Sequence, residues 1–110
     1  MTVVEVEPFP TRASLVWTDE ERMAFITFIA HYPEAGDVIP GSGGVRKIRW
    51  GRRGAGKRGG VRVIYYFHNE TMPLFLLTVY AKSRRVDLTK SELQTTRRLV
   101  AQLKAQYAQK

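Results

Sequence analysis

The residues best suited to chemistry are cations that gather in one part of the chain. No Asp or Glu occurs between Asp37 and Glu70, and this acid-free segment holds eight cations: Arg46, Lys47, Arg49, Arg52, Arg53, Lys57, Arg58 and Arg62. The segment carries the formal net charge of +8, because the other ten basic residues are balanced by ten acidic ones. Such a surface attracts a polyanion and steers its approach. The alternative is a solvated loop without a partner.

Alternation along the expected strands places these cations on particular faces. Alternate residues of a strand point the same way. With Ile48 and Trp50 as the inward pair of residues 45–50, Lys47 and Arg49 point together to the opposite face. If the neighbouring strands pair with this one, a single sheet face presents the candidate catalytic set, which is Lys47, Arg49, Arg62, Tyr66 and Lys82. Cations hold phosphates, and aromatic and guanidinium planes stack on splayed RNA bases.

The reaction that suits this face is attack of a ribose 2′-hydroxyl on the adjacent phosphate. It needs a base, positive charge for the phosphorane and an acid for the leaving 5′-oxygen. Lysine and tyrosine ordinarily titrate near pH 10, and we expect crowded cations to move both pKa values toward neutrality. A packing role for Tyr66 stays open, and Tyr65 is expected to pack. His68 is a weaker candidate for proton transfer, and His31 is expected at a helix C-terminus.

The elements that must position these residues predict an α+β fold. Strands are expected at residues 3–7, 45–50, 61–68 and 73–81, and the last of these is apolar enough to be covered on both faces. The last three form an antiparallel meander. Helices are expected from Thr18, ending before Pro33, and from near Thr89, each with a Thr-x-x-Glu capping box. We expect both helices to pack on one face of an antiparallel sheet, in a single domain spanning residues 1–110.

The glycine-rich loop between two of these strands contains two nucleotide-binding patterns by accident. Residues 51–57 fit the start of a phosphate-binding P-loop, but Arg58 replaces the hydroxyl residue that would hold magnesium. Residues 54–59 fit the dinucleotide fingerprint. Both patterns require a strand that leads into a helix, whereas this loop is expected to join two strands. A nucleotide cofactor is therefore not expected.

Composition narrows the functional class further. The chain has no cysteine and two histidines, which excludes disulfides and thiolate metal sites and makes a metal centre unexpected. The N-terminus is acidic and unlike a signal peptide, and no apolar run is long enough to span a membrane. We expect a cytoplasmic protein without cofactors.

Four motifs give the chain a family resemblance. They are Gly36-Asp37-Val38-Ile39, Gly43-Gly44-x-Arg46-Lys47-Ile48-Arg49, Gly56-Lys57-Arg58-Gly59-Gly60 and Arg62-Val63-Ile64-Tyr65-Tyr66, followed by LLTVYAKSRRVDLT. From about Pro33 to Leu88 the chain resembles the RelE/HigB superfamily of type II toxins, and most of all a HigB-like branch. The resemblance implies a small RelE-like toxin fold of the microbial ribonuclease type, with N- and C-terminal helices.

The resemblance also implies a function. Such toxins are metal-independent mRNA interferases, endoribonucleases that enter the ribosomal A site, cut mRNA and inhibit translation. A cognate helix-turn-helix antitoxin neutralises them, and the complex binds operator DNA. RelE-like toxins carry a basic pair on one strand, which is matched here by Lys47 and Arg49. They carry an arginine on the next strand, matched by Arg62, and a lysine after the last strand, matched by Lys82. Contacts to RNA or ribosome are expected from Arg46, Arg52, Arg53, Lys57, Arg58 and Arg84.

The chain also departs from the RelE-like pattern. Ser83 stands where such toxins carry an arginine, and the tyrosine a few residues later has no match among residues 86–88. Tyr66 or Lys57 is then the candidate to take its role. Two other functions remain open on these grounds: a non-catalytic basic module that binds RNA or the ribosome, and a decayed toxin that only sequesters its partner.

Overall fold

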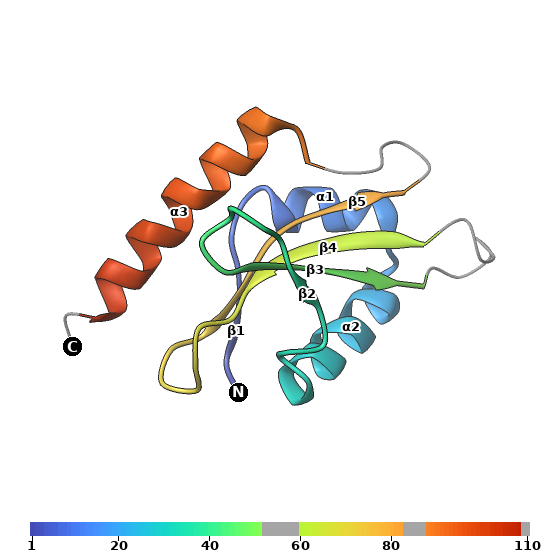
Figure 1. The fold of residues 1–110 in the computed structure, drawn as a ribbon. Coiled ribbons are helices and arrows are strands. Elements are labelled where there is room, and N and C mark those ends of the chain that lie inside the picture. Colours follow the sequence, from blue (N-terminus) through green and yellow to red (C-terminus); the bar gives the residue numbers. More distant parts are fainter. Residues whose placement is uncertain (52–59, 83–87, 109–110) are drawn as a thin grey trace.

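The structure is a computed structural model that describes residues 1–51, 60–82 and 88–108. Its elements follow the order β1 (Val3–Glu5), α1 (Phe9–Val16), α2 (Asp19–His31), β2 (Asp37–Val38), β3 (Val45–Trp50), β4 (Val61–Tyr66), β5 (Leu74–Ala81) and α3 (Lys90–Ala108) (Figure 1). The predicted α+β class is confirmed, and the expected strand at residues 45–50 has the bounds of β3.

One five-stranded sheet forms the centre of the fold, in the order β1-β5-β4-β3-β2. The expected antiparallel meander of β3, β4 and β5 is confirmed. The expectation of a wholly antiparallel sheet is wrong, because β1 pairs in parallel with β5. A register shift between Ile64 and Tyr65 interrupts the β4–β5 ladder. β2, which the sequence did not predict, adds a two-residue edge strand that pairs with β3.

Both predicted capping boxes are present. The Thr18 side chain accepts from the amide of Glu21, and the Glu21 carboxylate accepts from the amide of Thr18. Thr89 and Glu92 make the same reciprocal bonds at the start of α3. The sequence patterns did not predict α1, which follows Pro8 and contains Pro10. Proline is tolerated in the first turn of a helix, where its missing N–H has no intrahelical partner, and α1 begins there.

Helices cover both faces of the sheet, so the expectation that they pack on one face is wrong. One core cluster joins α1 and α2, through Phe9 and Phe25, to the face of β4 that carries Val63 and Tyr65. The other cluster joins α3, through Val100 and Leu103, to the opposite face. Figure 1 shows α3, in orange to red, apart from the blue and cyan α1–α2 pair. β5 lies between both clusters, which explains its continuous apolar sequence.

Candidate active site

Three cations from three neighbouring strands gather at one end of the sheet. Arg49 of β3 lies directly opposite Arg62 of β4 in the antiparallel register. Lys82 follows the last residue of β5, and its amide donates to the carbonyl of Gly60 next to the start of β4. We call Arg49, Arg62 and Lys82 the cation cluster. Like charges directly opposite each other destabilise a sheet, so folding alone gives no reason for this pairing.

The cluster changes the titration of Lys82. The Arg49 guanidinium, then that of Arg62, and then desolvation lower the pKa of Lys82 below the ordinary lysine value of 10.5. The direction agrees with the expectation that crowded cations disfavour protonated lysine. A larger fraction of Lys82 is therefore neutral amine near neutral pH than in an isolated lysine.

Arg62 provides donors that the fold does not use. Within the described residues its Nη1 atom is buried without a hydrogen-bond partner. A buried donor in this state carries a desolvation cost that the fold leaves uncompensated. Because the guanidinium has a fixed fork of N–H donors, it suits a phosphate oxygen that arrives at the cluster.

Lys47 shares the sheet face of the cluster. It lies two residues before Arg49 on β3, opposite Ile64 of β4, and its side chain is half-buried. The predicted alternation is confirmed, since Ile48 and Trp50 pack into the core cluster on the other face. The structure thus brings Arg49, Arg62 and Lys82 together at one end of the sheet, and Lys47 lies on the same face nearer the middle of β3.

The fifth candidate, Tyr66, lies on the same face but under α3. It is 2% exposed and packs in the core cluster with Val100 and Leu103. The expectation that crowded cations lower its pKa is wrong, because burial raises the pKa of Tyr66 above 10.0. A buried, neutral phenol does not suit the role of a base. Its hydroxyl instead lies 3.4 Å from Nδ1 of His68.

Arg46 is engaged with the main chain on the opposite face. Its Nη1 donates to the carbonyl of Gly36 at 2.7 Å and to that of Glu34 at 3.2 Å. Its cross-strand partner Tyr65 has the expected packing role: the Tyr65 hydroxyl accepts from the amide of Gly36 and donates to the carbonyl of Pro33. Together the two side chains hold the segment between α2 and β2.

Other predicted residues have different placements. His31 is the last residue of α2, as expected, with Nδ1 2.9 Å from the carbonyl of Thr27. The glycine-rich segment is preceded by β3 and followed by β4, which pair with each other, so the strand-to-helix setting of a P-loop is absent. Five of the expected RNA or ribosome contacts lie outside the described residues, namely Arg52, Arg53, Lys57, Arg58 and Arg84.

Among the described residues, no group of three or more His, Asp or Glu side chains gathers in a way that could hold a metal ion. None of the helices in this part of the chain combines the length and apolar character needed to cross a bilayer.

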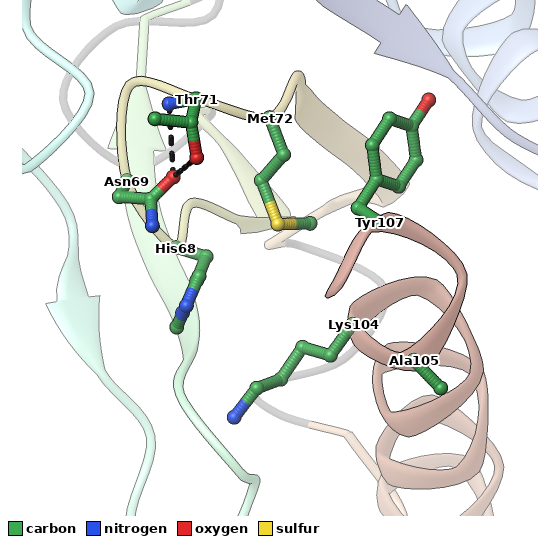
Figure 2. A pocket seen from close by; sticks show the side chains of 7 residues that line it. All are labelled: His68, Asn69, Thr71, Met72, Lys104, Ala105 and Tyr107. Carbon is green, nitrogen blue, oxygen red and sulfur yellow. Dashed lines mark hydrogen bonds between the residues drawn. The ribbon is translucent and has the colours of Figure 1, made fainter. Parts of the chain in front are cut away.

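Sequence reasoning missed a cavity between the β4–β5 connection and α3. It has a volume of about 340 Å³ and is lined by His68, Asn69, Thr71, Met72, Lys104, Ala105 and Tyr107 (Figure 2). The lining joins residues that are more than thirty positions apart, so no local pattern indicated it. The available signal was His68, which lies just beyond the end of β4.

Most of the chain matches a known protein family. The family described as the RelE toxin of the RelE/RelB toxin-antitoxin system matches residues 37–110. The match covers more than half of the chain and includes every member of the cluster, along with Lys47 and the cavity beside α3. The α+β architecture, with its mixed sheet and three helices, is consistent with a small RelE-like fold. The chain therefore belongs to the RelE toxin family.

Proposed function

We propose that this toxin is an endoribonuclease that cuts messenger RNA on the ribosome and thereby inhibits translation. The cation cluster is the observation that carries the proposal. Arg49 opposite Arg62 places two guanidinium groups where a phosphodiester and its phosphorane can bind. Lys82 adds an amine whose pKa the two arginines lower. Family membership supports the toxin role.

The proposed reaction uses only side chains of this chain. The neutral amine of Lys82 takes the proton of the ribose 2′-hydroxyl, and the 2′-oxygen forms a bond to phosphorus. Arg49 and Arg62 hold the charge that develops on the non-bridging oxygens. The bond from phosphorus to the 5′-oxygen breaks, and the ammonium of Lys47 gives that oxygen its proton. The products are a 2′,3′-cyclic phosphate and a 5′-hydroxyl end.

The other candidate residues have supporting roles in this proposal. Tyr66 is assigned to packing beneath α3 and takes no part in proton transfer. We assign contacts to the RNA backbone or ribosome to the basic residues of the glycine-rich loop and the segment after Lys82, namely Arg52, Arg53, Lys57, Arg58 and Arg84. Their charge is the support for this role.

The proposed partners follow from the family and from the charge. RelE toxins belong to toxin-antitoxin systems, so we propose a cognate antitoxin, of the helix-turn-helix type, encoded by a neighbouring gene. Operator DNA is then contacted through the complex. The ribosomal A site and its mRNA are the proposed targets, which places the action of the toxin in the cytoplasm.

The proposal is tested by mapping RNA ends in cells. Induced expression of the parent chain is expected to stop growth and to produce sharp cuts within translated messages, with cyclic-phosphate ends. Arg62→Ala is expected to abolish the cuts, and Arg97→Ala, an exposed arginine of α3, serves as the control that keeps them. Growth arrest with intact messages would instead support the non-catalytic RNA- or ribosome-binding module.

A further inference from the structure

The cavity between the β4–β5 connection and α3 lies apart from the cation cluster. His68 follows Arg62 by six residues, about 20 Å in extended chain, and Val100 and Leu103 of α3 pack on the sheet face between the two sites. At about 340 Å³ the cavity is at the lower end of the range of small-ligand pockets, about 300–1,000 Å³. The volume suits a ligand of the size of one nucleotide.

The lining of the cavity is divided into a polar and an apolar side. Figure 2 shows the ends of His68, Asn69 and Lys104 on one side, and Met72 with the ring of Tyr107 on the other. No Asp or Glu lines the cavity. The lining therefore combines a cation, an imidazole and an aromatic ring without a negative charge.

Hydrogen bonds fix the polar side in place. The Asn69 side-chain carbonyl accepts from the amide of Thr71 at 2.9 Å and from its hydroxyl at 2.6 Å (Figure 2). This orients the Asn69 amide nitrogen, which has two donors. The Tyr66 hydroxyl lies beside Nδ1 of His68, and the two rings stack with centroids 6.3 Å apart. The second nitrogen of His68, Nε2, is the one left to face a ligand.

Packing against the core fixes the apolar side of the cavity in place. Met72 is 6% exposed and belongs to the core cluster beneath α3. The ring of Tyr107 meets Phe75 edge-on, with centroids 5.7 Å apart, so its orientation is set by packing. A rigid aromatic ring beside a thioether offers a surface on which a flat base can lie.

We propose that this cavity binds a nucleotide. The base lies against Tyr107 and Met72, the Asn69 amide donates to its edge, and the phosphate meets Lys104 and His68. The site goes beyond the proposed cleavage reaction and does not depend on it. The nucleotide has two possible sources, a free mononucleotide or one unit of a single-stranded RNA, and they share this chemistry.

The test is a nuclear magnetic resonance titration of the full-length chain. The probes are adenosine 5′-monophosphate, uridine 5′-monophosphate, inorganic phosphate and a DNA octanucleotide, which has no 2′-hydroxyl and is not cleaved. A mononucleotide is expected to shift the amide signals of residues 68–72 and 104–107. Lys104→Ala and Tyr107→Leu are each expected to weaken this binding on the order of tenfold, whereas Lys90→Ala, in the first turn of α3, leaves it unchanged.

The outcomes separate the possibilities. No shifts at the cavity, or equal shifts and affinity with phosphate alone, would overturn the proposal. If the octanucleotide binds more tightly than the mononucleotide and Lys104→Ala removes that gain, the site holds a unit of a nucleic acid strand. If it binds no more tightly, the site holds a free nucleotide. Because Lys104 is exposed, its variant is expected to fold, and cleavage mapped in cells tests the proposed function separately.

Discussion

Arg49 and Arg62 lie directly opposite each other on two neighbouring antiparallel strands. Two arginines in this position repel each other, and a sheet selected for stability alone would pair either of them with a carboxylate or an apolar residue. The pairing is therefore unfavourable for the stability of the fold but favourable for the proposed reaction, which needs positive charge at this place. Variants at this end of the sheet are expected to separate stability from activity.

Arg62→Gln is expected to make the protein more stable and less active. Removing one of two opposed charges stabilises the fold by up to about 1 kcal/mol. Loss of the phosphate donors slows cleavage on the order of 10²–10³-fold. Urea unfolding and cleavage in a translation extract measure the two effects. A loss of both stability and activity would show that Arg62 mainly supports the fold.

Arg46→Ala is expected to have the opposite effect. The Arg46 guanidinium holds the carbonyls of Glu34 and Gly36, and its removal leaves them without this donor. The expected cost is about 1–3 kcal/mol in the free energy of unfolding, with cleavage retained at a temperature where the variant is folded. Arg98→Ala, at an exposed position of α3, is the control. A selective loss of cleavage would assign Arg46 to RNA binding.

Arg49→Gln is expected to move the pH dependence of cleavage. If Lys82 acts as the base, the rate rises with pH as its ammonium loses a proton. The Arg49 charge is the main cause of the lowered pKa of Lys82, so its removal raises that pKa and shifts the rising limb to higher pH. Rates measured from pH 6 to 10 for the parent, Arg49→Gln and Arg97→Gln test this. An unmoved limb would contradict the assignment of Lys82 as base.

Tyr65→Phe is expected to destabilise the protein without a direct effect on cleavage. The hydroxyl accepts from the amide of Gly36 at 2.8 Å and donates to the carbonyl of Pro33 at 2.9 Å. Its loss leaves two main-chain groups unpaired, at an expected cost of about 1–3 kcal/mol. Tyr32→Phe, at an exposed tyrosine, is expected to cost little. Equal stability of the two variants would show that the Tyr65 bonds contribute nothing.

The same tyrosine is expected to make stability fall at alkaline pH. Burial raises the pKa of Tyr65 above 10.0. In the unfolded chain the tyrosine has its ordinary pKa and loses this proton near pH 10. The folded chain keeps the proton to higher pH. The contribution of neutral Tyr65 is fully present below pH 10 and is lost as the pH rises through the raised pKa. Tyr65→Phe is expected to have a smaller fall in unfolding free energy between pH 9 and 11.5, and an identical fall would contradict the prediction.

The sequence was informative where a local pattern has one structural solution. Alternation around Ile48 and Trp50 predicted which cations share a face, because strand periodicity admits no other arrangement. The two Thr-x-x-Glu boxes predicted where α2 and α3 begin, because the reciprocal bonds involve neighbouring residues.

Long-range packing could not be predicted from the same patterns. The apolar seam of α3 does not say which sheet face it covers, and its packing over Tyr66 is what buries this phenol. The parallel pairing of β1 with β5 joins segments about seventy residues apart. β2 has only two residues, too few to show a period. The continuous apolar sequence of β5 was the one sign that helices lie on both faces.

One face of β3 packs in the core and the other carries cations, and this arrangement also limits which insertions and deletions the gene tolerates. Inserting or deleting a single residue within Val45–Trp50 would turn Ile48 and Trp50 outward and drive the cations into the hydrophobic interior. Point substitutions at the exposed Arg49 leave that parity intact. Viable length variants in this stretch are therefore expected to differ by two residues, while attenuated toxins are expected to arise by replacement of individual cations.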